Sequence, residues 1–351
     1  MHLHEIFGRI ARMGHAVTLV AHRFPGSPPQ ETLDGIRVMR VGRKFDFNFR
    51  ALPFCLRLLG RERFDVAIED LNKLPFFLAF RAKIPCCAIL HHFFGSSIWR
   101  ETNPVFATYV GLGEWIVKRT YRSLPFCAVS ESTAAELTSS GFDPGKVRII
   151  HNAVDHDVYT RSESVAKIPG RIVYLGRVKR YKGIDIILRS LVQVRQEMRD
   201  AHLVVVGGGD DRPRLERITR ELGLGGSVRF LGHVETPVKI RQLREAQVMV
   251  TPSPKEGWGV TTIEANACGT PVIASDVPGL RDAVLDGETG LLFPFGDVPA
   301  LSDRITRLLN DEALRRELTA KAIEWAGRFR WERSAHETVE WLESVIAERA
   351  H

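Results

Sequence analysis

Two glutamates flank a loop with two glycines in the second half of the chain. The stretch SPKEGWGVTTIEANACGTPVIAS, residues 253–275, places Glu256 and Glu264 eight positions apart. After the apolar run VMVTPS, the pattern predicts a loop that enters a helix at TTIEANACG. The first amides of a helix lack partners inside it and lie at the positive end of its dipole, so they can bind phosphate. We therefore expect the amides of Gly259 to Thr262 to form an anion site.

The two carboxylates need a different kind of partner, because they repel phosphate. Hydroxyl groups beside the phosphate would serve, such as a ribose for one glutamate and a sugar for the other. A nucleoside diphosphate sugar offers both groups at once. The alternative is that Glu256 and Glu264 are two solvated glutamates, which is the usual meaning of an isolated pair at this spacing.

A second stretch supplies cations that favour the phosphate interpretation. In YLGRVKRYKG, residues 174–183, a predicted strand is followed by Arg177 and Lys182 and then by a helical pattern. The planar fork of Arg177 can hold phosphate oxygens, and Lys182 adds a mobile point charge. Two cations beside a diphosphate can neutralise a departing group as a divalent metal does elsewhere. Lys179 and Arg180 are expected to face solvent.

Two further motifs admit less specific interpretations. The glycines of HLVVVGGGDDRPRLER fit a strand-end turn on the nucleotide side better than a dinucleotide fingerprint, because Asp210 and Asp211 would repel a pyrophosphate. In CCAILHHFFG, His91 and His92 follow a buried strand at its carboxyl edge. Adjacent histidines on a strand end point apart and have no obvious third ligand, so one is expected to line the site and the other to pack.

Short β-branched runs alternate with helical patterns twice along the chain. This alternation predicts an α/β protein with two parallel, doubly wound sheets, and a ligand site in a cleft where the carboxyl ends of the strands face each other. The polar segment 161–170, RSESVAKIPG, is predicted to link a first domain, 1–160, to a second, 171–330. The expected strands are 16–22, 36–41, 64–68, 86–90, 126–130 and 147–150, then 171–176, 202–207, 228–232, 248–253, 271–275 and 290–293.

Composition excludes several classes of protein. The 351 residues are 44% hydrophobic and 26% charged, which fits a soluble chain of two domains. Five cysteines without a C-x-x-C pair fit a reducing cytoplasm and no structural zinc. The most apolar region is broken by Arg81 and Lys83 before it could span a bilayer. The excess of +7 lies mostly in residues 1–165, where 21 Lys or Arg oppose 16 Asp or Glu. This half either meets an anionic surface or substrate or carries a solvated basic face.

Taken together, the motifs resemble the retaining glycosyltransferases of family 4, a large group of bacterial sugar transferases with the GT-B fold. The matching stretches follow one another in family order and extend from about residue 3 to the end of the chain. They are CAVSESTAAEL, KVRIIHNAVD, YLGRVKRYKG, VRFLGHV, VTPSPKEGWGVTTIEANACGTPVIAS and DGETGLLFPFGDVPAL.

The resemblance assigns roles to individual residues. It implies that Arg177 and Lys182 bind the donor diphosphate, that Glu264 binds the ribose, and that Glu256 contacts the hydroxyls of the transferred sugar. Further implied contacts are the amides of Gly259, Val260 and Thr261 to the sugar and distal phosphate, His91 near the sugar and acceptor, and the backbone near Val234 to the base. It also implies retention of anomeric configuration without a metal, and a helix in 331–351 that returns to the first domain.

The expected partners are a nucleoside diphosphate sugar and a saccharide or lipid-linked acceptor of the cell envelope, with no nucleic acid. The basic apolar stretch FNFRALPFCLRLLGRERF, residues 47–64, carries Arg50, Arg57, Arg61 and Arg63. This stretch predicts a cytoplasmic protein in peripheral contact with the anionic inner face of the membrane.

The start of the chain departs from the family pattern. MHLHEIFGRIARMGHAVTLV enters midway through the family's first helix, without the opening strand and glycine-rich loop. In a sheet ordered 3-2-1-4-5 this leaves a gap between two strands. We expect Met1 to be internal to a longer protein, with about 15 to 25 residues before it.

Two other functions are compatible with these motifs. A GT-B sugar-nucleotide epimerase would use acid and base groups in the same cleft without an acceptor. A catalytically silent subunit would bind a nucleotide sugar and release no nucleotide.

Overall fold

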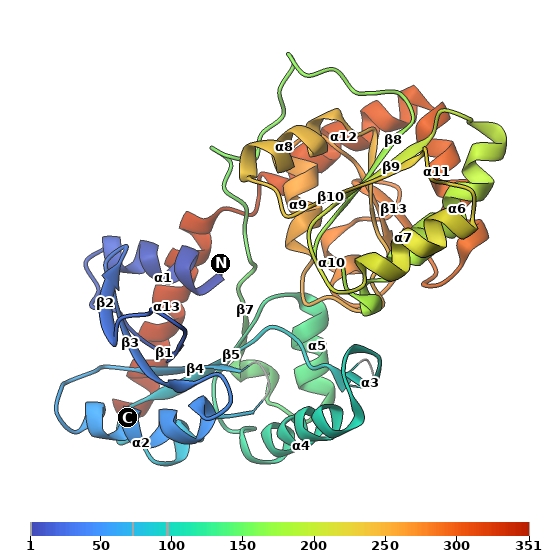
Figure 1. The fold of residues 1–351 in the computed structure, drawn as a ribbon. Helices are drawn as coiled ribbons and strands as arrows, with labels where there is room; N and C mark the ends of the chain where they lie inside the picture. Colours follow the sequence, from blue (N-terminus) through green and yellow to red (C-terminus); the bar gives the residue numbers. More distant parts are fainter. Residues whose placement is uncertain (1, 72–73, 96–97, 351) are drawn as a thin grey trace. The chain divides into compact units, whose positions relative to one another are not determined.

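The computed structural model describes residues 2–71, 74–95 and 98–350, which form two compact units (Figure 1). The first unit holds the chain up to Ile98, residues 102–152 and the chain from Trp331 onward; the second holds residues 153–330 and the short piece 99–101. Segment 161–170, the predicted linker, lies within the second unit. Its backbone is hydrogen-bonded there: Ile168 N donates to Glu245 O at 2.8 Å, and Gly170 N donates to Gln247 Oε1 at 2.6 Å. Met1 lies outside the described residues.

The second unit contains one six-stranded parallel sheet with the order β10-β9-β8-β11-β12-β13. All six strands predicted for this half are confirmed. They are β8 (Arg171–Leu175), β9 (His202–Val206), β10 (Val228–Gly232), β11 (Val248–Thr251), β12 (Val272–Ser275) and β13 (Gly290–Phe293). The order reverses between β8 and β11, and such a switch point is where open α/β sheets bind ligands.

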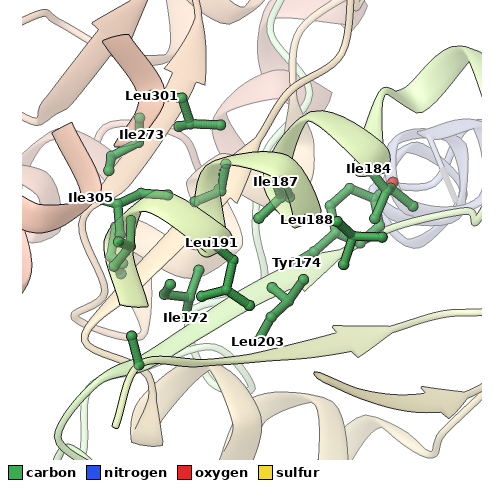
Figure 2. Packing of buried hydrophobic residues seen from close by; sticks show 14 of the residues in the cluster. Ile172, Tyr174, Ile184, Ile187, Leu188, Leu191, Leu203, Ile273, Leu301 and Ile305 are labelled. Atoms are coloured by element: carbon green, nitrogen blue, oxygen red, sulfur yellow. The ribbon is translucent and has the colours of Figure 1, made fainter. Parts of the chain in front are cut away.

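Helices pack against this sheet through apolar side chains at helical spacing. On α6, Ile184, Ile187, Leu188 and Leu191 are fully buried and lie over the strands (Figure 2). Burial of each such side chain contributes roughly 1.5–3 kcal/mol. The helices of the second unit are α6 (Ile184–Glu197), α7 (Arg212–Glu221), α8 (Thr236–Glu245), α9 (Val260–Ala267), α10 (Leu280–Ala283), α11 (Val298–Asn310) and α12 (Glu312–Ala326).

The first unit has two sheets, with orders β1-β3-β2 and β4-β5-β6-β7, where one doubly wound sheet is predicted. Within the described residues, β1 pairs with β3 and β4 pairs with β5, so the division falls between β1 and β4. The strands are β1 (Thr18–Arg23), β2 (Gln30–Leu33), β3 (Ile36–Arg43), β4 (Ala67–Leu71), β5 (Cys86–Leu90), β6 (Phe126–Ala128) and β7 (Val147–Ile149).

Strand β2 is absent from the predicted strands and runs antiparallel to β3. A two-residue turn joins them, in which Asp34 has φ 48° and Gly35 has φ 83°. An Asp-Gly pair with two positive φ values is typical of the tight turn that matches the twist of a hairpin. The Asp34-Gly35 pair was therefore the overlooked sequence signal.

The last helix, α13 (Trp331–Ala350), belongs to the first unit, where it packs beside α1 (Figure 1). Its buried Trp341 and Val345 join a core cluster with Cys87 and Ile89 of β5. The other helices of this part of the chain are α1 (His2–Arg12), α2 (Phe47–Leu59), α3 (Ile98–Glu101), α4 (Pro104–Thr120) and α5 (Glu131–Ser139). None of the helices in the described part of the chain is both long enough and apolar enough to cross a bilayer.

Candidate functional site

The predicted anion site lies where the chain leaves β11 and enters α9. Gly259 is the N-cap of α9 with φ 80°, and Thr262 N already donates to Gly259 O at 2.8 Å. Gly259, Val260 and Thr261 are half-buried. The amides of these three residues precede the first backbone hydrogen bond of the helix, so they are the donors that an anion can use.

Backbone packing fixes the position of Glu256 in this loop. Gly279, with φ 79°, lies behind the loop, and a Cβ on it would stand 2.1 Å from Glu256 O. On the other side, a Cβ on Gly183 would stand 2.6 Å from Pro252 O. The loops after β8 and β11 therefore approach more closely than side chains allow, which is why glycine is needed at both places.

Glu256 forms an ion pair with Lys182: Lys182 Nζ donates to Glu256 Oε1, and the side chains are 11% and 21% exposed. Lys182 was predicted as a phosphate ligand and Glu256 as a sugar ligand. The structure brings these two side chains together. An ammonium group has three N–H donors, so Lys182 can hold Glu256 and still donate to a phosphate.

Arg177 follows the end of β8 and is exposed. Its Nη2 donates to Tyr181 Oη at 2.7 Å, while Tyr174 Oη donates to Arg177 O at 2.9 Å. Burial raises the pKa of Tyr174 well above its ordinary value, so this hydroxyl remains a donor. Arg177 is thus anchored through its backbone, and its exposed guanidinium lies beyond the carboxyl end of β8, where it can bind an anion.

Glu264, one turn into α9, is 3% exposed. Its Oε1 accepts a hydrogen bond from Lys239 Nζ at 3.4 Å, and its Oε2 is buried without a hydrogen-bond partner among the described residues. Burial raises the pKa of Glu264, and both Lys239 and the Tyr159 hydroxyl act in the opposite direction. The two glutamates therefore have separate cationic partners, Lys182 for Glu256 and Lys239 for Glu264.

The glycines of 207–209 directly follow β9, where the sequence predicts a strand-end turn, and the turn itself falls at Asp210 and Asp211. A Cβ on Gly207 would stand 1.9 Å from Gly176 O, and one on Gly209 would stand 1.9 Å from Val178 O. These glycines allow close backbone packing between the loops after β8 and β9. Asp210 and Asp211 are paired with Lys179 and Arg214, at 2.7 Å in each case. The rejection of a dinucleotide fingerprint stays a prediction from the sequence.

Three predicted features belong to other segments of the chain. His91 follows β5 in the first unit, with Nε2 3.0 Å from Asp70 Oδ1. The ring of His92 meets Phe94 edge-on at 4.7 Å. Val234 lies in the second unit between β10 and α8, and α8 carries Lys239. No group of three or more His, Cys, Asp or Glu in the described ranges is placed to hold a metal ion.

Sequence reasoning missed Lys239, which pairs with Glu264, and Tyr159, whose ring lies beside that lysine. Lys239 lies in the first turn of α8, which follows the loop that carries Val234. Tyr159 lies before the first strand of the second unit, and Lys239 Nζ is 4.6 Å from the centre of its ring. The sequence gives one usable signal: α8 leads directly into β11, so the start of α8 lies near the end of the sheet from which the loop of Glu256 emerges.

Two family models match the chain and together account for residues 1–325. Residues 1–158 match the model described as Glycosyltransferase Family 4, and residues 159–325 match the model described as Glycosyl transferases group 1. Among curated relatives, a D-inositol 3-phosphate glycosyltransferase of Kribbella flavida is 32% identical over 230 residues, 60% of this chain and 54% of that protein. A phosphatidyl-myo-inositol mannosyltransferase of Mycobacterium leprae is 34% identical over 202 residues, 56% of this chain and 53% of that protein. The chain spans about half the length of these relatives.

Solved structures also resemble the chain. A sucrose-phosphate synthase of Thermosynechococcus elongatus aligns with a TM-score of 0.82 at 23% identity, over 99% of this chain and 93% of that one. The Anabaena protein HepE, in complex with UDP and glucose, aligns with a TM-score of 0.74 at 17% identity, over 93% of this chain and all of that one. At these identities the likeness shows the fold.

Proposed function

Because this chain belongs to the family 4 glycosyltransferases and has the GT-B fold, we propose that it transfers a sugar from a nucleoside diphosphate sugar to an acceptor hydroxyl. The observation that carries the proposal is the composition of the β8–β11 switch point. Two cations, free amides of a helix and two carboxylates with separate lysine partners lie at the carboxyl ends of neighbouring strands. Complementary groups of the donor are a diphosphate, a ribose and a sugar.

Each part of the donor has a proposed partner. Arg177, Lys182 and the amides of Gly259, Val260 and Thr261 bind the diphosphate and the sugar. Glu264 accepts hydrogen bonds from the ribose, and the base lies against the backbone near Val234. The HepE structure with UDP and glucose supports the choice of a nucleoside diphosphate sugar, because that protein shares the fold.

The proposed transfer retains anomeric configuration. The bond between the anomeric carbon and the diphosphate oxygen breaks, and the acceptor oxygen bonds to the same carbon from the same face. The acceptor proton passes to the departing phosphate. Positive charge develops on the sugar in the transition state, and Glu256 contacts the hydroxyls of the sugar at that stage. His91 contributes a polar contact to the sugar and the acceptor. Lys182 and Arg177 stabilise the charge on the leaving diphosphate, so no metal is required.

The first test is a panel of nucleoside diphosphate sugars in EDTA, followed by thermal unfolding. A ligand at 100 times its dissociation constant stabilises a protein by ~2.7 kcal/mol, so one donor class should raise the melting temperature clearly. With acceptor or water, that donor should release nucleoside diphosphate in EDTA at the rate seen with Mg²⁺.

Each of the other outcomes would indicate a different function for this protein. Stabilisation without nucleotide release would indicate a silent binding subunit, and conversion of the donor to its epimer would indicate an epimerase. Activity restored by a divalent cation alone would show that Arg177 and Lys182 do not suffice. No stabilisation by any donor would contradict the proposal as a whole.

We also propose that the acceptor is a saccharide or lipid-linked saccharide of a bacterial cell envelope, presented at the cytoplasmic face of the membrane. In the first unit, Arg50, Arg57, Arg61 and Arg63 are exposed on α2 and the turn after it. Phe45 and Phe49, beside them in sequence, are 89% and 75% exposed. Exposed aromatic rings among arginines suit the interface of an anionic bilayer.

Replacing Arg57, Arg61 and Arg63 together by Gln should weaken binding to vesicles of anionic phosphatidylglycerol. Each arginine near such a surface contributes ~1 kcal/mol, so the partition coefficient should fall on the order of a hundredfold. The measurement is co-sedimentation with vesicles of increasing anionic content. A matched triple on the second unit, Arg217, Arg316 and Arg328 to Gln, removes arginines that are also exposed and should have little effect. Sedimentation that ignores anionic content would remove the basis for this contact.

A further inference from the structure

The carboxylate of Glu264 is asymmetric in its contacts. Oε1 has a partner, Lys239 Nζ at 3.4 Å, whereas Oε2 is buried and has none among the described residues. Buried polar atoms in folded proteins nearly always find a partner, and an unsatisfied one carries a desolvation cost. A ligand that donates a hydrogen bond to Oε2 recovers that cost on binding.

Lys239 is itself held firmly. Its side chain is 18% exposed, it rises from the first turn of α8, and its ammonium group lies 4.6 Å from the centre of the Tyr159 ring. Cation–π attraction is strongest where the cation is shielded from water, so the ring restricts the ammonium group as the carboxylate does. Lys239 therefore joins α8 and α9 through a shielded ion pair.

We propose that Lys239 is a positioning residue for the donor's ribose: it holds Glu264 through Oε1 and leaves Oε2 to accept hydrogen bonds from the ribose hydroxyls. This inference rests on the proposed donor site. The inference adds Lys239, a residue of α8, to the residues that support donor binding. It also gives a function to the contact between Lys239 and Oε1 of Glu264. Lys239 acts through Glu264 and needs no contact with the donor.

The electrostatics of the pair support this role. Burial raises the pKa of Glu264, and Lys239 is the larger of the two side-chain influences that lower it, the other being the Tyr159 hydroxyl from segment 153–170. Cys268, the residue that caps the end of α9, also interacts with Glu264, and burial raises the pKa of its thiol to about 12, so it stays neutral. Without Lys239 the carboxylate would take up a proton at a higher pH and lose its capacity to accept two hydrogen bonds.

The test measures binding of the nucleoside diphosphate chosen from UDP, GDP and ADP by the donor panel, and of its 2′-deoxy analogue. The full chain is compared with Lys239→Met, Lys239→Arg, Glu264→Gln and the Lys239→Met/Glu264→Gln double variant by calorimetry from pH 5.5 to 8.5. Lys321→Met is the matched control, since Lys321 pairs with Glu317 on the surface of α12, where both are about half exposed.

Lys239→Met should weaken binding of the ribonucleotide about tenfold or more, and it should weaken binding of the 2′-deoxy analogue by a clearly smaller factor, because that analogue keeps only the 3′-hydroxyl. The loss should deepen as the pH falls, because protonation of Glu264 then begins at a higher pH than in the parent chain. Lys239→Arg should restore most of the affinity, and the double variant should bind as Glu264→Gln does, because the two residues act as one unit.

Three outcomes would overturn the inference. These are equal losses for both nucleotides in Lys239→Met, additive losses in the double variant, or a pH profile identical to that of the parent chain. The first two would make Lys239 a direct ligand or a structural residue. If the parent chain binds no nucleoside diphosphate, the proposed function fails first, so the two failures are distinguishable.

Discussion

Glu256→Gln should lower turnover about 100- to 1,000-fold while changing the affinity for the donor little. The expected size is that of removing one preorganised electrostatic contact to a transition state. As the bond to the diphosphate breaks, positive charge develops on the sugar, and a carboxylate that touches its hydroxyls gains interaction at that moment. The packing of Gly279 fixes the backbone of Glu256 and the ion pair with Lys182 holds its carboxylate, so its contribution needs little rearrangement.

Steady-state kinetics with varied donor concentration check this prediction, because a change in kcat reports the transition state and a change in KM alone reports binding of the donor. Glu317→Gln, which removes the exposed partner of Lys321, is the control for the loss of a glutamate beside a lysine. A variant with unchanged kcat and a raised KM would show that Glu256 serves ground-state binding, and the proposed division of roles would be wrong.

Glu264→Gln should have the opposite signature, with donor affinity about tenfold to a hundredfold weaker and turnover of bound donor nearly retained. A hydrogen bond to a charged group contributes ~1.5–3 kcal/mol, and the ribose keeps this bond in both ground and transition states. Glu264 is also buried, so water cannot easily replace the lost contact.

Binding of donor and of nucleoside diphosphate, measured separately, checks this expectation. Both should weaken by the same factor, because the ribose is common to them. A loss confined to the intact donor would place Glu264 at the sugar, and undiminished affinity for both would show that its partner is Lys239 alone.

The sequence predicted the second unit almost completely. Its six strands are four or five residues long and, except for β10, are mainly apolar and buried, which is the pattern of parallel strands covered on both faces. Local signals also located the end of β9 before Gly207 and the helix that begins after Gly259, because a strand end, glycines and a helical pattern occur within a few residues there.

Contacts between distant segments were beyond such reasoning. The pairing of Lys182 with Glu256 joins residues that are 74 positions apart, and that of Lys239 with Glu264 joins side chains from two different helices. Patterns of apolar residues fix which face of a helix is buried, but they do not fix which polar atoms meet at its edge. The division of the first unit's strands into two sheets depends on pairing across many residues in the same way.

Because α13 belongs to the first unit, the core of that unit cannot be completed until the end of the chain has been synthesised. Trp341 and Val345 complete a core whose other members, such as Cys87 and Ile89, leave the ribosome much earlier. Residues 153–330, the body of the second unit, are made in between. At about 5–20 residues per second, translation of that stretch takes on the order of ten to forty seconds. During this interval the first unit exposes the apolar surface that α13 later covers. A chaperone that protects this surface would therefore have to stay bound until the last residues of the chain are made.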